Sequence, residues 1–297
     1  MDANLFPSAR LFIYNNARLL ERRLFEHLFE NGSRQAVIEA LKAYQNPDGG
    51  FGHALEPDKR VPSSQPLDIQ FALEVLDRCD LLRDPQVQRD LLLPACDFLF
   101  AVAAPDGGVS CVRAGVNAYP HAPWWTVDES KAPSGDLNPT AAIVGLLLKA
   151  GIQHPWLVGA VAFCRAAVVA NEDDWFHTVT CALTFLEHLP DRVWAEGQLA
   201  NLEARLRKPG VIELNPNAAG YVQMPLDWAP TPRHFARRLF DEATMARHLL
   251  ALQNRQLPDG GWPITWDPIS PAVELEWRGI RTLDALLTLR AYAVIQE

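Results

Sequence analysis

The sequence predicts an all-α protein, a closed ring of about five to six helix pairs of the kind called an α/α toroid. Three observations lead to this prediction. The turn sequence Pro-Asp-Gly-Gly recurs along the chain, the segments beside its copies have apolar residues at helical spacing, and the alternating pattern of β-strands is weak throughout. We expect a single toroid domain over residues 1–297.

The repeated turn sequence sets the period. It occurs at residues 47–50, 105–108 and 258–261. Asp48 and Asp106 are 58 residues apart, and Asp106 and Asp259 are 153 residues apart, which is close to three steps of about 51. Proline at the second position of a turn, followed shortly by glycine, predicts a tight reversal of the chain at each copy.

Helices are predicted on both sides of these turns. Leu67–Leu76 and Thr140–Lys149 have the apolar spacing of helices. Further helices are expected near residues 9–31, 85–103, 155–170, 174–189, 192–207, 236–254 and 272–296. Several are apolar on nearly all faces and neither end has a polar capping repeat, which favours closure of the ring over an open solenoid.

Two segments rich in Pro, Gly and Trp interrupt this pattern, near residues 109–136 and 211–235. Long ordered loops in a compact domain are usually functional. We therefore expect both loops to cover one mouth of the ring.

The two best copies of the repeat carry a family resemblance. Gln45-Asn-Pro-Asp-Gly-Gly-Phe51 and Gln256-Leu-Pro-Asp-Gly-Gly-Trp262 resemble the Gln-x(2–5)-Gly-x-aromatic repeats of terpene cyclases and protein prenyltransferase β subunits. Those families are α/α toroids, and their repeat Gln and aromatic residues connect one helix end to the next turn. The resemblance implies the same structural roles here, and it implies a class II terpene cyclase activity that needs neither a metal nor another cofactor.

Class II cyclases carry Asp-x-Asp-Asp at the start of an inner helix, and the middle Asp is the acid that protonates the substrate. This chain has Asn171-Glu172-Asp173-Asp174 before the helical run Trp175–Leu189. The resemblance implies Asp173 as the catalytic acid and Asp174 as its neighbour, with Asn171 in place of the first carboxylate. Adjacent carboxylates and an apolar wall would raise the pKa of one of them. The alternative is that the acidic run only caps the helix.

Asp136 is the third candidate catalytic residue. It begins the run Asp136-Leu-Asn138-Pro139-Thr140, which is similar to a distorted copy of the acid motif at another helix start. The alternative is again a cap, with Pro139 in the first turn of the helix.

Aromatic rings would stabilise a carbocation without reacting with it. The expected substrate-binding residues are Trp124, Trp125, Trp175, His177, Tyr221, Trp228, Trp266 and Trp277. His177 follows the acid run by one helical turn and could tune a carboxylate. Tryptophan beside paired carboxylates also suits a carbohydrate-active enzyme, and a non-catalytic toroid that binds a ligand or a partner is the other alternative.

The segment after the first turn holds a further polar group. His53, Glu56 and Asp58 lie close together in sequence, directly after Gly52. We expect a solvated loop, and the alternative is that these side chains gather at a mouth of the ring.

Composition limits the partners and the compartment. The formal charge of −9 and the absence of a basic stripe argue against nucleic acid. The most apolar run, Ala141–Leu148, is far shorter than the roughly 20 residues that a bilayer requires. Five cysteines without a CxxC spacing, and a start that lacks a secretory pattern, favour a cytoplasmic protein with reduced thiols. The expected partner is a small hydrophobic isoprenoid substrate.

Overall fold

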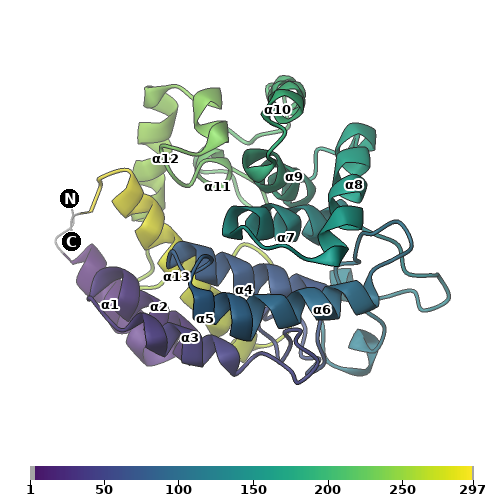
Figure 1. The fold of residues 1–297 in the computed structure, drawn as a ribbon. Helices are drawn as coiled ribbons and strands as arrows, with labels where there is room; N and C mark the ends of the chain where they lie inside the picture. Colours follow the sequence, from purple (N-terminus) through teal and green to yellow (C-terminus); the bar gives the residue numbers. More distant parts are fainter. Residues whose placement is uncertain (1–3, 296–297) are drawn as a thin grey trace. The chain divides into compact units, whose positions relative to one another are not determined.

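The all-α class is confirmed by the computed structural model, which describes residues 4–295 (Figure 1). Apart from two isolated β-bridges, Gln45 with Phe51 and Lys59 with His121, every regular element in this range is helical. None of the helices in this range is long and apolar enough to span a bilayer. The chain divides into two compact units, one of residues 38–202 and the other of the chain up to Val37 together with the chain from Glu203 onward.

The unit of residues 38–202 is built around α7 (Leu137–Ala150), whose residues are nearly all buried. Figure 1 shows α7 between α4 (Pro66–Arg78) and α9 (Phe176–His188), and it packs against both. Two further helices, α6 (Leu93–Val102) and α8 (Pro155–Ala170), pack against each other, and α8 also packs on α7.

The other unit joins the two ends of the chain. Its first helices, α1 (Leu5–Asn16) and α2 (Leu19–Phe29), both pack against α13 (Pro271–Ala291). The short α11 (Pro225–Trp228) packs against α12 (Glu242–Asn254). Two helices, α3 (Arg34–Lys42) and α10 (Arg192–Leu206), contain the boundaries between the units.

The structure corrects several of the predicted helix bounds. The α-helix expected near 236–254 begins only at Glu242, after the 3-10 helix Phe235–Leu239, and the one expected near 272–296 ends at Ala291. Residues 9–31 form two helices, because Ala17 and Arg18 are extended. A Cβ on Gly279 of α13 would lie 2.8 Å from Ala17 Cβ, so α13 approaches the chain closely at the break. Residues 85–103 are helical as expected, but Gln88–Leu92 form a π turn. That wider turn directly precedes Pro94, which has no N–H to give to the carbonyl group four residues earlier.

The three repeated turns have the same backbone geometry, as the sequence predicts. Each turn is closed by the same pair of backbone hydrogen bonds, which in the first copy run from Asn46 N–H to Gly50 O at 2.8 Å and from Gly49 N–H to Asn46 O at 2.9 Å. The first of the two glycines has φ between +87° and +92° in all three copies, at Gly49, Gly107 and Gly260. Asp48, Asp106 and Asp259 each accept the N–H of the glycine two residues later.

The repeat glutamines fasten these turns to helices. Gln45 Nε2 donates to Gly49 O at 2.9 Å and to Leu91 O at 3.2 Å. Gln256 Nε2 donates to Gly260 O at 2.9 Å and to Leu5 O at 2.8 Å.

The middle copy of the repeat has no glutamine at this position. There Trp156 Nε1 donates to Gly107 O at 3.1 Å instead. Phe51 and Trp262, the aromatic residues of the two good copies, are buried. The repeat residues therefore have structural roles.

The two long loops occur where the sequence places them. Residues 109–136 contain only the 3-10 turns Val116–Ala118 and Pro123–Trp125. Residues 211–235 contain α11 and the first residue of a 3-10 helix, Phe235–Leu239. Closure of the ring, a single domain, and a common mouth for both loops stay predictions.

Candidate functional site

The predicted acid run lies at the surface before α9. Asp173 is exposed, and its carboxylate accepts the backbone N–H of Trp175 at 2.9 Å. Asn171 Oδ1 accepts the N–H of Asp173 at 3.2 Å. Asp174 is half-buried. Asp173 therefore satisfies a free amide at the start of the helix, and its role as an acid stays a prediction.

The two aromatic neighbours of this run lie beside it. Trp175 is 52% exposed, and its ring centroid is 5.8 Å from that of His177. Burial lowers the pKa of His177, so the imidazole favours its neutral form.

Asp136 lies at the surface directly before α7. Its backbone N–H donates to Val109 O at 3.0 Å. The atoms packed around its carboxyl group remove water from it and raise its pKa.

Three of the predicted aromatic residues meet in the unit that joins the chain ends. Trp266 packs edge-to-face on Trp277 with centroids 5.2 Å apart, and on Tyr221 with centroids 5.9 Å apart. Trp228 is buried in the same unit, in α11. These rings pack against one another, which is an arrangement that stabilises a core as well as one that binds a ligand.

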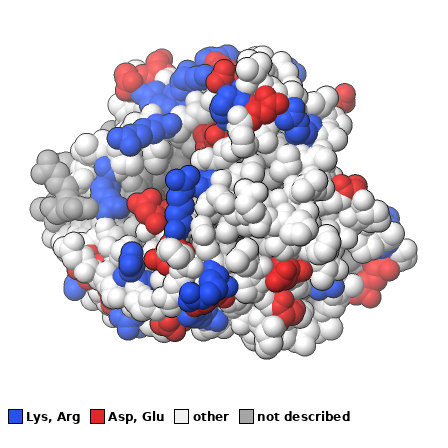
Figure 2. All heavy atoms as spheres, viewed as in Figure 1, with Lys and Arg blue, Asp and Glu red and all other residues white. Residues whose placement is uncertain are grey.

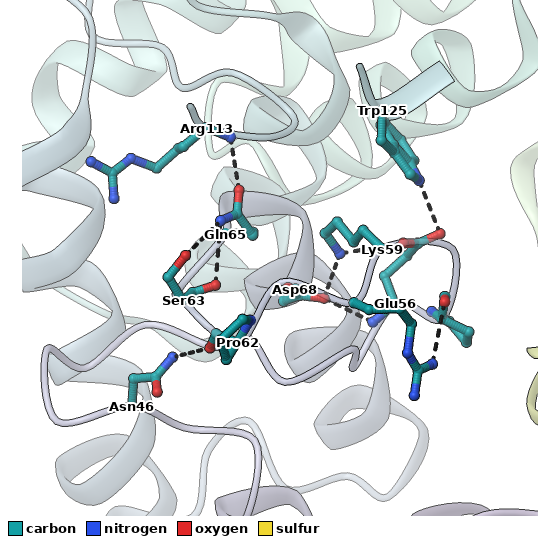
Figure 3. Close-up of polar contacts among 11 residues, drawn as sticks. Asn46, Glu56, Lys59, Pro62, Ser63, Gln65, Asp68, Arg113 and Trp125 are labelled. Atoms are coloured by element: carbon teal, nitrogen blue, oxygen red, sulfur yellow. Dashed lines mark hydrogen bonds and ion pairs between the residues drawn. The ribbon is translucent and has the colours of Figure 1, made fainter. Parts of the chain in front are cut away.

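The other predicted pair, Trp124 and Trp125, forms a 3-10 turn in the loop of residues 109–136. Trp124 is 51% exposed. Trp125 is half-buried, and its Nε1 donates to Glu56 Oε1 at 3.3 Å (Figure 3). Trp125, a predicted binding residue, thus contacts the buried carboxyl group of Glu56.

Glu56, Lys59 and Asp68 form a buried charged cluster (Figure 3). Lys59 Nζ donates to Asp68 Oδ1 at 2.7 Å and to Glu56 Oε2 at 3.3 Å. Asp68 Oδ1 also accepts the backbone N–H of Glu56 at 2.7 Å. The side chains of Lys59, Asp68 and Glu56 are 0%, 0% and 3% exposed. We call these three residues the Glu56 cluster.

The expectation of a solvated loop after the first turn is therefore wrong. Residues 54–59 are buried, and only His53 of the three polar residues considered there is exposed. The segment is held by two backbone bonds to the long loop, from Ala122 N–H to Asp58 O at 2.7 Å and from Arg60 N–H to Pro120 O at 2.9 Å. These bonds give hydrogen-bond partners to backbone groups of the segment, which a buried segment requires.

The backbone that leads into the Glu56 cluster is strained. His53 and Ala54 have φ of +56° and +61°, a region that residues with a side chain occupy rarely. Such strain persists only where the surrounding structure enforces it, and it occurs often at functional sites. His53 is held by its ring Nε2, 2.9 Å from Asn46 Oδ1.

Burial raises the pKa of Glu56 to about 7, and the neighbouring Asp58 and Asp68 add to this effect while Lys59 opposes it. Val61, Val112 and Val116 form a buried apolar cluster against which Trp125 packs. The pKa of Glu56 thus lies near neutral pH, the range in which a carboxyl group works best as a general acid or base.

Sequence reasoning missed this site because it was assembled by tertiary contacts. The sequence predicts a loop around Glu56, and no motif in it distinguishes Lys59 or Asp68. Trp125 is 69 residues from Glu56 in sequence. The available signal is Asp68 in the first turn of α4, between the apolar residues Leu67 and Ile69.

No group of His, Cys, Asp and Glu side chains within residues 4–295 has the arrangement of a metal site. All five cysteines are free thiols in the structure. Comparison with protein-family models and with curated proteins finds no match to this chain.

Proposed function

We propose that this chain is a terpene cyclase-like enzyme in which Glu56, not Asp173, supplies the proton. The observation that carries the proposal is a buried carboxyl group with a pKa of about 7 next to the indole ring of Trp125. Asp173 is exposed, and its carboxylate accepts the backbone N–H of Trp175 at the start of α9.

The resemblance to toroid cyclases supports the reaction class. Both good repeats use Gln and an aromatic residue as the resemblance implies, with Gln45 and Gln256 making matching pairs of bonds. Fold alone does not determine activity, so the assignment depends on the Glu56 cluster.

The proposed step is a proton transfer that balances over the whole reaction. The Glu56 carboxyl group gives its proton to a carbon–carbon double bond, which leaves a carboxylate and a carbocation. Lys59, 3.3 Å away, stabilises the carboxylate, and the indole of Trp125, which lies beside Glu56, would stabilise the cation. Loss of a proton from the cyclised cation restores the acid, so the product is an isomer of the substrate.

Substrate access requires Trp125 to move. Glu56 is 2% exposed, and Trp125 donates to its Oε1. Trp125 is half-buried and ends a short 3-10 turn in a long loop, so displacing it opens the site without breaking an α-helix.

The test is a product screen by mass spectrometry. The purified protein is incubated with squalene, geranylgeraniol, and farnesyl and geranylgeranyl diphosphates, with and without magnesium. We expect a cyclised product from the wild type, none from Glu56→Gln, and product from the matched surface variant Glu172→Gln.

A product that survives in Glu56→Gln and disappears in Asp173→Asn would overturn the assignment of the acid. The absence of any product from folded wild-type protein would contradict the cyclase proposal. The binding toroid and the carbohydrate-active enzyme would then be tested in turn, beginning with the aromatic group of Tyr221, Trp266 and Trp277.

A further inference from the structure

A groove of about 500 Å³ lies between α12 and residues 216–218, all within the unit that joins the chain ends. Arg247, Leu250 and Asn254 lie on one face of α12, because residues three and four positions apart are neighbours on a helix. The groove is shallow and open to solvent. Figure 2 shows Lys and Arg side chains gathered, among carboxylates, over the part of the view where Figure 1 draws α12.

Arg255 supplies a half-buried charge to this groove. Its guanidinium group donates to Pro216 O at 2.8 Å and to Met224 Sδ at 3.1 Å, which fixes its position. No carboxylate within residues 4–295 lies at ion-pair distance from it. Half-buried charges usually have a partner of opposite sign, so this group is suited to an anion from outside the chain.

Arg247 supplies a second charge with no carboxylate at ion-pair distance in the described part of the chain. Its guanidinium group donates only to Thr244 Oγ1, at 3.1 Å, and its side chain is exposed. No Asp or Glu lines the groove. A protein with a formal charge of −9 thus presents a small concave surface whose only ionised side chains are two arginines.

A second groove in the same unit shows what arginines do when they serve the fold. Arg237 and Arg238 line it, and both have carboxylate partners: Arg237 pairs with Glu242, and Arg238 pairs with Glu203 at 2.7 Å. The arginines of the α12 groove have no such partners, so the two grooves differ in the charge that they offer to a ligand.

The donors in the α12 groove favour a phosphate group over a carboxylate. Two guanidinium groups and the side-chain amides of Asn217 and Asn254 line the groove. A carboxylate has two oxygens and is satisfied by one arginine fork, whereas a phosphate offers three oxygens and more negative charge. Leu250, which is 57% exposed, provides an apolar surface beside these donors.

We propose that the α12 groove binds a small organic phosphate, with the phosphate group between Arg247 and Arg255 and the apolar body against Leu250. This site is separate from the Glu56 cluster, and its occupation does not depend on the proposed cyclase activity. Measuring binding instead of turnover therefore tests it independently.

Isothermal titration calorimetry with hexyl phosphate tests the proposal. Inorganic phosphate and hexanol serve as probes of the two halves of the ligand. We expect hexyl phosphate to bind more tightly than either probe, and its affinity to fall as NaCl is added because the contact is ionic. Arg247→Ala should weaken binding about tenfold or more, since charge-assisted hydrogen bonds are lost.

Arg238→Ala is the matched control, because it removes the same charge from the other groove. Its binding should equal that of the wild type. Arg247 makes one exposed contact, so its removal leaves the fold intact, which circular dichroism verifies. Equal affinity in Arg247→Ala and wild type, equal losses in both variants, or hexanol binding as tightly as hexyl phosphate would each overturn the proposal.

Discussion

Replacing Lys59 with methionine tests whether the Glu56 cluster is a coupled buried charge group. The change keeps an unbranched apolar chain and removes the ammonium group. Asp68 loses a partner at 2.7 Å and Glu56 one at 3.3 Å, at a place where the three side chains are almost completely shielded from water. Removing one member of a buried ion pair costs about 3–5 kcal/mol, because the remaining charge stays buried without compensation.

The chain offers a matched control in Lys149→Met. Lys149 pairs with Asp77 at 2.6 Å, but the two side chains are 39% and 27% exposed. Water screens a pair of this kind, so we expect its loss to cost about 1 kcal/mol or less. The measurement is urea unfolding of both variants and the wild type, followed by circular dichroism.

The pH dependence sharpens this test. Without Lys59, the pKa of Glu56 rises further above its unfolded value, because Lys59 lowers it in the native protein. A carboxyl group whose pKa is raised in the folded state makes the protein less stable as pH increases from the unfolded pKa to the folded pKa. Lys59→Met should therefore be least destabilised at pH 5 and most at pH 8. A cost no larger than that of Lys149→Met, or one independent of pH, would refute the reasoning.

Three further predictions concern the same elements. The raised pKa of Glu56, about 7 in the folded protein against an ordinary 4.5, lowers the unfolding free energy as pH increases through this range, by on the order of 3 kcal/mol in total. Glu56→Gln removes this loss. The unfolding free energies measured in urea at pH 5 and pH 8 should therefore differ less in the variant than in the wild type. Gln256→Ala removes one bond from the last repeat turn to the first helix and one bond within the turn, and it should lower the unfolding free energy by about 1–3 kcal/mol. Gln253→Ala, which removes one bond of 3.3 Å within α12, should cost less in the same assay. Gly260→Ala should lower the unfolding free energy by about 4 kcal/mol or more in thermal unfolding, because the added Cβ would lie 2.1 Å from the backbone oxygen of Ser8. Gly220 is the control, because it has a similar φ but no atom within 4 Å of the added Cβ. A cost above about 2 kcal/mol for Gly220→Ala would show that backbone conformation alone explains both losses.

Local signals account for what the sequence could predict. The repeated turns need only Pro, Asp and Gly at fixed positions, and their three copies share one geometry. The helices near 174–189 and 192–207 end within about two residues of α9 and α10 because apolar spacing and neighbouring polar residues define them locally. The break at Ala17 lies where Gly279 of α13 approaches the chain, a long-range contact that no pattern around Ala17 contains.

The Glu56 cluster could not be predicted from local patterns either, because long-range contacts form it. A Glu, an Asp and a Lys beside prolines have the composition of a loop, and loops are usually solvated. The segment is buried because residues 120–125 cover it, and those residues are more than sixty positions away. Predicting its burial would have required knowing that the long loop of residues 109–136 folds back onto this segment.

The joining of both chain ends in one unit has a consequence for synthesis of the protein. Residues 38–202 are complete as a unit long before the ribosome reaches α13, whereas α1 and α2 have to wait for it. At ordinary translation rates that interval is on the order of tens of seconds. Phe12, Leu24 and Phe25, which are buried in the finished protein, stay without their final cover during that time. The amino-terminal helices are therefore the part of the nascent chain for which a chaperone has most use, and a circular permutant that makes residues 203–295 before residues 4–37 would remove the delay.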